Sequence, residues 1–190
     1  MKGVNKLNTV EPIRGKDMII DMAEILKSYS ERDYVLFMTG IYIGRRISDI
    51  LPLRVSDVKD KDYIYFREKK TGKETNIIIN KKLKSIYKQY CKDKKLNEYL
   101  FPPLKGKKNR HITRQQYWNI LQKAAQDLGY GHKIGCHSMR KSLGRKLYED
   151  GVDVAVIMMI LGHDDIKTTK RYIGVTGDEI NSILSKVDFG

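Results

Sequence analysis

The chain has 190 residues, of which 41% are hydrophobic and 32% are charged, a composition that indicates a folded globular protein and excludes a largely disordered one. Its 37 Lys and Arg residues against 23 Asp and Glu residues give a net charge of +14, which favours a polyanionic partner, although a basic, well-solvated surface would give the same count. The sequence contains no run of 18 apolar residues and no apolar secretory signal, so it predicts no membrane span, and its two cysteines favour a reduced, cytoplasmic setting.

Helices are predicted in the first part of the chain, after a short leader over residues 1–14. Apolar residues recur at helical spacing from about 16 to 29 and again from about residue 31, which predicts two helices. Residues 46–51 can form a short third helix, which Pro52 ends because its ring disfavours helical geometry in the preceding residue.

The middle of the chain has a strand-like pattern. The segments YIYF (63–66) and NIII (76–79) are rich in β-branched and aromatic residues, and a polar stretch that contains Gly72 separates them. They predict a hairpin or part of a three-stranded sheet. The sequence therefore predicts an α+β fold that is mostly α-helical with one small antiparallel β-sheet. Its further helices are expected over about 83–90, 113–128, 138–150, 153–161 and 178–187.

Two groups of cations in the first half could bind an anion. Arg45 and Arg46 begin the short helix, and Asp49 lies one helical turn after Arg46. This arrangement is either a surface ion pair of little energetic value or an arginine held by a carboxylate to bind a phosphate bidentately. The predicted hairpin turn carries lysines that are either solvated or able to reach into a cleft, namely Lys69, Lys70 and Lys73.

The segment CHSMRKSLG combines a histidine and an arginine at helical spacing. His137 and Arg140 are three residues apart, so they point to one side of a helix. Met139 begins the adjoining apolar stripe, which places the pair at the border of the core. Gly144 lies on the same polar edge and is expected to leave room for another backbone. The alternative interpretation of His137 is a core histidine with satisfied hydrogen bonds.

The segment ILGHDDIKTTKRY surrounds a tyrosine with cations. Gly162 ends the preceding helix and places His163 in a turn, and either Asp165 or Thr168 can cap a short helix that carries Tyr172. A phenol is a poor nucleophile until its anion and its target are stabilised, and phosphate is a target that cations hold. The alternative is a tyrosine that packs at the edge of the core.

A metal site is the rival interpretation of the histidines. His132, Cys136 and His137 are close in sequence, but no second cluster with zinc spacing and no HExxH motif accompany them. We therefore expect no metal ligands. A GxSxG motif is also missing, so a serine hydrolase has no support.

Taken together and in this order, the four segments resemble the catalytic domain of the tyrosine recombinases, the phage integrase family. RISDILPL is similar to the family's box around its first arginine, which favours the second arginine of the pair, and KTGK is similar to its hairpin lysine box. CHSMR and LGH match the His-x-x-Arg and Leu-Gly-His boxes, and the tyrosine follows at the family's usual spacing. The resemblance covers about residues 11–185. The catalytic residues that it implies are Arg46, Lys70, His137, Arg140, His163 and Tyr172, with Lys69 or Lys73 in place of Lys70 if the turn register differs.

Two features depart from the family's pattern. Lys141 stands where many members have a second histidine. In addition, the roughly 45 residues before Arg46 are too few for the DNA-clamping helical domain of the family. We therefore interpret residues 15–190 as a catalytic domain without an N-terminal core-binding domain, which is either excised from a longer protein or naturally short.

The resemblance implies a site-specific DNA recombinase or integrase that cleaves and rejoins strands through a 3′-phosphotyrosyl intermediate, without metal, cofactor or ATP. Arg46 and Arg140 would hold the non-bridging phosphate oxygens, and His163 would donate a further hydrogen bond to them. Lys70 would protonate the leaving 5′-oxygen. His137 would accept the phenolic proton or orient the phosphate.

The implied partners are double-stranded DNA and other protomers in a synaptic tetramer, with a monomer when free. The implied location is the cytoplasm of a bacterial cell or phage-infected host, at the nucleoid. The alternatives are a type IB topoisomerase that relaxes DNA and a non-catalytic DNA-binding accessory module. The topoisomerase shares the chemistry but usually not the His-x-x-Arg box, and a non-catalytic module should lack a catalytic side chain, whereas none is missing here.

Overall fold

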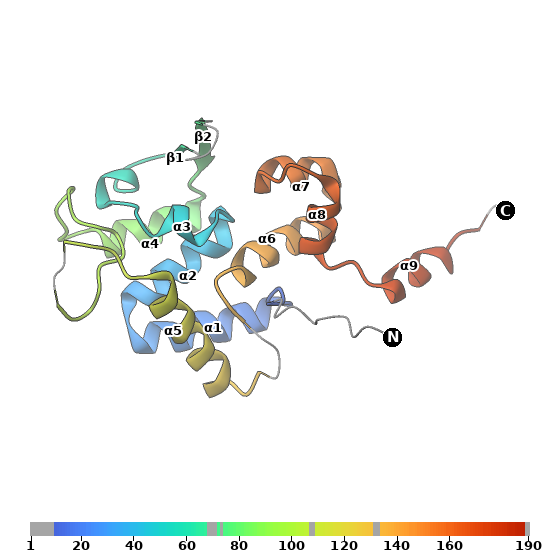
Figure 1. Ribbon diagram of the computed structural model, residues 1–190, viewed down its shortest axis with the longest axis horizontal. Coiled ribbons are helices and arrows are strands. Elements are labelled where there is room, and N and C mark those ends of the chain that lie inside the picture. Colours follow the sequence, from blue (N-terminus) through green and yellow to red (C-terminus); the bar gives the residue numbers. More distant parts are fainter. Residues whose placement is uncertain (1–9, 68–71, 73, 107–108, 131–133, 189–190) are drawn as a thin grey trace, which may run out of the picture.

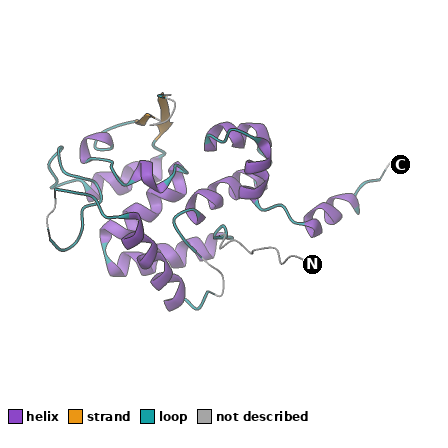
Figure 2. Cartoon of the chain, viewed as in Figure 1, coloured by secondary structure: helices purple, strands orange, loops and turns teal. Residues whose placement is uncertain are grey.

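The computed structural model describes residues 10–67, 72, 74–106, 109–130 and 134–188, and the account of the structure is confined to them. Most of these residues are helical, and two of the segments form a small antiparallel sheet (Figures 1 and 2). The predicted fold class is therefore confirmed. The elements are α1 (Lys16–Tyr29), α2 (Glu31–Ile43), α3 (Ile47–Ile50), a 3-10 turn (Val55–Asp57), β1 (Tyr63–Arg67), β2 (Glu74–Ile78), α4 (Lys81–Tyr90), α5 (Arg114–Asp127), α6 (Ser138–Glu149), α7 (Val154–Leu161), α8 (Ile166–Ile173) and α9 (Gly177–Leu184).

Side-chain caps fix where several helices begin. The Ser30 side chain accepts the Asp33 N–H at the start of α2, and Thr113 and Gln116 form a reciprocal capping box at the start of α5. Of the two caps that the sequence left open for α8, the structure has Asp165, which accepts the Thr168 N–H at 2.7 Å. These caps satisfy backbone donors that have no partner inside their own helix.

Glycines in the left-handed conformation end the three helices that surround the candidate site. Gly44, Gly162 and Gly174 follow α2, α7 and α8 with φ values of 62°, 61° and 70°. Other L-residues adopt this conformation at a cost, which explains why glycine stands at each position. At two of these caps, the Gly44 and Leu161 carbonyls are buried acceptors for a side chain of the candidate site.

The two strands pair antiparallel in a single register, from Tyr63 opposite Ile78 to Arg67 opposite Glu74. One face of β1 is buried, because Ile64 is 0% exposed, whereas the neighbouring tyrosines face solvent. Of the two arrangements that the sequence left open, the described residues form the two-stranded hairpin. The turn lysines Lys69, Lys70 and Lys73 lie outside the described residues.

The buried apolar side chains form two clusters of unequal size. The larger one draws on α1 to α5, on β1 and on the start of α6, whereas the smaller one centres on Ile157, Leu161 and Ile173 of α7 and α8. Helix α6 contributes to both, because Met139 is buried in the larger cluster and Leu143 packs against the smaller one. Figure 1 shows α6, α7 and α8 grouped beside the larger body. The site described below lies at this junction.

The two ends of the described chain differ in their packing. The last residues of the predicted leader pack on α6: Ile13 is 2% exposed, and its N–H donates to Ser142 Oγ at 2.7 Å. Helix α9 stands apart from the other helices in Figure 1. It ends at Leu184, earlier than the predicted residue 187, because the chain leaves the helix in a turn that the Val187 N–H closes on the Leu184 carbonyl at 3.2 Å. Over the described residues, no helix combines the length and apolar character needed to cross a membrane.

Candidate active site

Three of the predicted catalytic side chains gather around the ring of Tyr172. The Tyr172 hydroxyl lies 3.2 Å from Nδ1 of His137. The imidazole of His163 packs edge-on against the phenol with 4.5 Å between ring centroids, and the Arg140 guanidinium lies 5.7 Å from the Tyr172 centroid. These residues come from α6, α8 and the turn between α7 and α8, so the fold joins segments that are separate in the sequence.

Arg140 is buried at the junction of two helix ends. Only 2% of it is exposed. Its Nη1 donates to the Gly44 carbonyl after α2 at 2.7 Å, and its Nη2 donates to the Leu161 carbonyl at the end of α7. Helix C-termini carry partial negative charge and unpaired carbonyls, so both acceptors stabilise a cation. The two glycine caps therefore create the acceptor site for this side chain.

The remaining donors of Arg140 can bind a ligand. A guanidinium has five N–H groups, and the two carbonyls use only two of them. Nε of Arg140 is buried and has no hydrogen-bond partner among the described residues. Burial lowers the pKa of Arg140 to about 10, which still leaves it protonated near neutral pH. The group is thus a fixed positive charge with spare donors beside the phenol.

One ring nitrogen of His163 has a hydrogen-bond partner, and the other has none among the described residues. Nδ1 lies 3.0 Å from Oγ1 of the fully buried Thr169, one helical turn before Tyr172. Nε2 is buried and unpartnered within the described part of the chain. Burial, followed by the nearby charges of Arg140 and Arg46, lowers the pKa of His163 to about 4. The imidazole is therefore neutral near pH 7.

His137 is suited to receive the phenolic proton. It lies directly before α6, where its backbone occupies the N-cap position without a side-chain cap. Burial first, and then the positive charge of Arg114, lowers the pKa of His137 from its usual value. A neutral ring whose Nδ1 lies 3.2 Å from the Tyr172 hydroxyl can accept its proton.

Arg45 and Arg46 differ sharply in exposure. Arg45 is 6% exposed and lies over the Phe66 ring, 5.8 Å from its centroid, whereas Arg46 is exposed at the start of α3. Arg46 still contributes to lowering the pKa of His163, so its charge acts on the site. In the part of the chain that is described, Arg46 forms no ion pair with Asp49, whose carboxylate instead accepts from Ser48 at 3.4 Å. The predicted support of Arg46 by Asp49 is not formed in this structure.

Lys141 and Thr169 belong to the site but were missed as functional residues by the sequence reasoning. Nζ of Lys141 lies 5.5 Å from the Tyr172 centroid and donates to the Val10 carbonyl at 2.8 Å. Burial lowers the pKa of this amine. The signals were present, because Lys141 follows Arg140 directly and Thr169 lies three residues before Tyr172, but neither residue type is diagnostic by itself.

Two further expectations can be compared with the structure. Gly144 was expected to admit another backbone, but a Cβ added there would meet the Leu161 side chain at 3.1 Å and that of Ile157 at 3.9 Å. The expectation was wrong because α7 approaches α6 with its side chains. Among the described residues, no cluster of three or more His, Cys, Asp or Glu side chains could hold a metal ion.

Comparisons with known proteins agree with this geometry. A model of the phage integrase family matches residues 16–179. The chain is 41% identical over 172 residues to the probable integrase/recombinase YoeC of Bacillus subtilis (strain 168), covering 90% of this chain and 93% of the relative. It is 29% identical over 161 residues to the tyrosine recombinase XerA of Pyrococcus horikoshii, covering 82% of this chain but 54% of that protein.

Solved structures share the fold at low sequence identity. A crystal structure of XerA recombinase superimposes with a TM-score of 0.76 at 19% identity, covering 95% of this chain and 67% of that one. The pre-cleavage complex of the XerH site-specific recombinase with its difH substrate gives a TM-score of 0.70 at 18% identity, covering 97% of this chain and 56% of that one.

Proposed function

The chain belongs to the phage integrase family, and on that premise we propose that it is a site-specific DNA recombinase that cleaves DNA through Tyr172. The observation that carries the proposal is the contact between the Tyr172 hydroxyl and Nδ1 of His137 at 3.2 Å, formed beside the buried Arg140 guanidinium. A proton acceptor and a fixed cation at one phenol are what nucleophilic attack on a phosphodiester requires.

In the proposed reaction, the Tyr172 oxygen forms a bond to the phosphorus, and the bond from phosphorus to the 5′-oxygen breaks. His137 accepts the phenolic proton, and Lys70 donates a proton to the leaving 5′-oxygen. The product is a 3′-phosphotyrosyl link with a free 5′-hydroxyl. Attack of a 5′-hydroxyl on this link reverses the step, so strands are rejoined without ATP.

In this proposal, Arg140 and His163 donate hydrogen bonds to the growing negative charge on the phosphate. Nε of Arg140 and Nε2 of His163 support this role, because both are buried and unpartnered among the described residues. Arg46 would reach the same phosphate from the start of α3, where its exposure leaves it free to reorient. Charge stabilisation by these three groups is the basis for proposing that cleavage needs no divalent metal.

Double-stranded DNA is the proposed substrate. The surplus of 37 Lys and Arg residues over 23 Asp and Glu residues suits a polyphosphate, and the XerH complex named above holds its DNA substrate. A lambda integrase dimer with 16% identity and a TM-score of 0.69 is likewise bound to a core site. We further propose a monomer in free solution, a tetramer on paired sites and action in the cytoplasm of a bacterial cell.

The test is covalent capture on a nicked suicide substrate, from which the cleaved strand diffuses away. The wild type should give a protein–DNA adduct on denaturing gels, with or without EDTA, and Tyr172→Phe should give none while it binds DNA with nearly unchanged affinity. Tyr130→Phe is the matched control, because that hydroxyl bonds Asp21 at 2.8 Å and lies outside the site. An adduct that persists in Tyr172→Phe would show that another residue is the nucleophile.

Two outcomes would favour the alternatives. Relaxation of supercoiled DNA of any sequence, without strand exchange, would indicate a topoisomerase. DNA binding without an adduct on any candidate site would indicate a non-catalytic module.

A further inference from the structure

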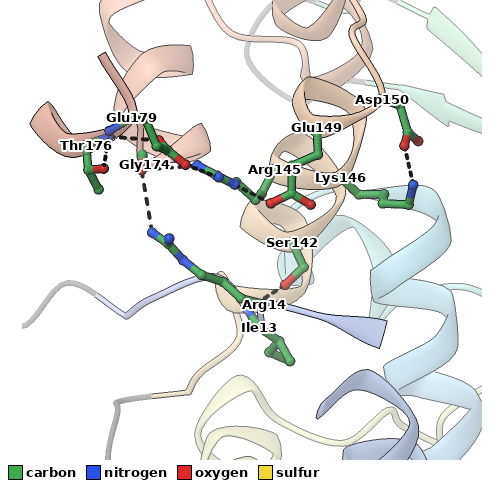
Figure 3. Close-up of polar contacts among 10 residues, drawn as sticks. All are labelled: Ile13, Arg14, Ser142, Arg145, Lys146, Glu149, Asp150, Gly174, Thr176 and Glu179. Atoms are coloured by element: carbon green, nitrogen blue, oxygen red, sulfur yellow. Dashed lines mark hydrogen bonds and ion pairs between the residues drawn. The ribbon is translucent and has the colours of Figure 1, made fainter. Parts of the chain in front are cut away.

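Arg145 connects three separate parts of the structure on the side of α6 that bears the end of α8 (Figure 3). It is 9% exposed. Its Nε donates to Glu149 of the same helix at 2.6 Å, its Nη1 donates to the Gly174 carbonyl at 3.4 Å, and its Nη2 forms an ion pair with Glu179 of α9. These contacts use all three nitrogens of the planar guanidinium, an arrangement that a point charge such as an ammonium group could not reproduce.

The Gly174 carbonyl lies at the end of the helix that carries the candidate nucleophile. Gly174 caps α8 two residues after Tyr172. Its carbonyl also accepts from Nη2 of Arg14 at 3.5 Å, so two cations converge on the negative end of this helix dipole. The position of the last turn of α8 is therefore tied to α6, which also carries Arg140 and begins directly after His137.

The segment between α8 and α9 also contacts this guanidinium at its far end, through Glu179. One carboxylate oxygen pairs with Arg145, and the other accepts the Thr176 N–H at 2.9 Å. The Glu179 N–H in turn donates to Oγ1 of Thr176 at 3.3 Å, which closes a reciprocal cap over the first turn of α9. The bond from Arg145 is the main reason why the pKa of Glu179 falls to about 2. The segment 174–179 is thus anchored at both ends to one side chain.

We propose that Arg145 is a positioning residue for the nucleophile, and that Glu179 holds Arg145 in the geometry that grips the end of α8. The inference rests on the proposed function. The contact from Tyr172 to His137 is a single hydrogen bond of 3.2 Å, and small displacements of a reacting group cost large factors in rate. Without the fork, Arg14 at 3.5 Å would be the one side-chain donor left on the Gly174 carbonyl among the described residues.

The kinetic test uses Arg145→Met, which removes the guanidinium and its charge, and Glu179→Gln, which removes charge with little change of shape. Single-turnover cleavage at saturating DNA should fall roughly tenfold or more in each, while the Kd for DNA changes little. Lys146→Met is the matched control, because it removes an exposed ion pair between Lys146 and Asp150 next to Arg145. Lys146 makes no hydrogen bond or ion pair to the described residues of the 174–179 segment. We expect its rate to stay within about twofold of wild type, as for an exposed ion pair.

Arg145→Lys distinguishes positioning from simple stabilisation. Lysine can keep the ion pair with Glu179 but cannot also reach the Gly174 carbonyl and Glu149, so it should retain most of the thermal stability while the cleavage rate remains low. Rates that follow Tm across Arg145→Lys, Arg145→Met and Glu179→Gln would overturn the proposal. So would rates that all match the Lys146→Met control.

A second measurement does not depend on catalysis. Amide hydrogen exchange in residues 166–179 should be faster in Arg145→Met and Glu179→Gln than in the wild type or Lys146→Met, in the absence of DNA. If the wild type formed no covalent adduct, the proposed function would fail while this measurement still reported on the anchor. Unchanged exchange in both variants would show that Arg145 does not hold the end of α8.

Discussion

Arg140 and Arg46 are proposed to hold the same phosphate, yet the fold presents them in opposite ways. Arg140 is 2% exposed and donates two hydrogen bonds, to the Gly44 and Leu161 carbonyls. Arg46 is exposed, and within the described residues it has no hydrogen bond or ion pair from its side chain. The Arg140 guanidinium is thus buried and held by the fold, whereas the Arg46 guanidinium lies on the surface close to the site.

This difference divides the candidate site into a preset part and an adaptable part. The preset part comprises Tyr172 and the groups that already touch its ring or hydroxyl, His137, His163 and Arg140. Oriented donors that need no rearrangement give the largest electrostatic effect on a transition state. Arg46 must instead lose side-chain freedom when DNA binds, so its contribution is reduced by the ordering cost.

Replacing each arginine by alanine should separate the two parts, with the largest effect at Arg140. Arg140→Ala should slow cleavage by on the order of 10² or more, the usual effect of losing one preorganised donor, and Arg46→Ala should slow it less, because Arg46 must first lose side-chain freedom. Arg140→Ala should also destabilise the fold, because each helix-end carbonyl left buried without a donor costs about 1–3 kcal/mol. Arg46→Ala should change the free energy of unfolding by less than about 0.5 kcal/mol. Urea unfolding and single-turnover cleavage measure the two effects.

Equal losses of stability in the two variants would contradict the division. A cleavage loss confined to Arg140→Ala would place Arg46 outside the site and would leave Arg45 to be tested in its place. Arg140→Lys is an informative companion variant, since a single ammonium cannot reach both the Gly44 and the Leu161 carbonyls with the geometry of a guanidinium.

A sulfur substitution can identify the general acid among the lysines that the sequence offers. A bridging 5′-phosphorothiolate provides a leaving group that needs no protonation, so it should restore cleavage to Lys70→Ala but not to Arg140→Ala. Rescue of Lys73→Ala in place of Lys70→Ala would move the role within the hairpin turn. Cleavage of the sulfur substrate on denaturing gels is the measurement.

The sequence motifs predicted the side chains that the fold brings together at Tyr172, namely His137, Arg140 and His163, but not the contacts that support them. The motifs are local, since His137 and Arg140 lie one turn apart and Tyr172 follows His163 on the next helix. The carbonyl partners of Arg140 lie 96 and 21 residues away, and nothing in the local pattern indicates them. Helix limits such as 16–29 followed from periodicity, and the cap of α8 is one of the two residues that the sequence offered, Asp165 rather than Thr168.

Arg145 shows why the remainder was not predictable. In the sequence, Arg145 and Glu149 are an i,i+4 pair, which by itself indicates an exposed ion pair of little energetic value. Only the fold brings Glu179 and the Gly174 carbonyl to the same guanidinium. The packing of residues 10–14 on α6 is likewise a tertiary contact, because the backbone N–H of Ile13 bonds Ser142.

Two glycines, Gly40 in α2 and Gly144 within α6, should respond oppositely to alanine, and their effects on the free energy of unfolding should be smaller than that of Arg140→Ala. A Cβ at Gly40 of α2 would lie 2.3 Å from Sδ and 3.1 Å from Cβ of Met139, in the larger cluster. Gly40→Ala should therefore cost about 1–3 kcal/mol, the range for overpacking a dense core. At Gly144 the nearest atom is the end of the Leu161 side chain at 3.1 Å, which can shift. Gly144→Ala should gain up to about 0.5 kcal/mol of helix propensity, net of that shift.

Urea unfolding of both variants tests this contrast between the packing of the two clusters. Destabilisation of similar size at both positions would show that the smaller cluster around Ile157 and Leu161 is packed as rigidly as the larger one. Gly40→Ala should also reduce cleavage more than Gly144→Ala, because Met139 directly precedes Arg140 in α6.

The smallest expected effect is a pH dependence of stability that reports on His163. Its pKa is about 4 in the folded protein against 6.5 for an unperturbed histidine, so the unfolded chain binds more protons between these values. The stabilisation is fully present above pH 6.5 and is lost as the pH falls toward 4. The lowered pKa of His137 acts in the same direction. The ring of His163 is only half buried, so solvent screening keeps the effect small.

The pH range over which His163 affects stability differs from that of the carboxylates, and its slope also tests whether the charge of Arg46 acts on the site. Glu179, with a pKa of about 2 against 4.5, loses its contribution only below pH 4.5, so the interval from 4.5 to 6.5 reports on histidines. Thermal unfolding over that interval should show Tm falling with pH in the wild type and falling less in His163→Gln. Arg46→Ala should also flatten the slope, because the charge of Arg46 helps to lower the pKa of His163. A slope in Arg46→Ala as steep as in the wild type would mean that this exposed charge is screened from the site, and that the site is organised around Arg140 alone until DNA arrives.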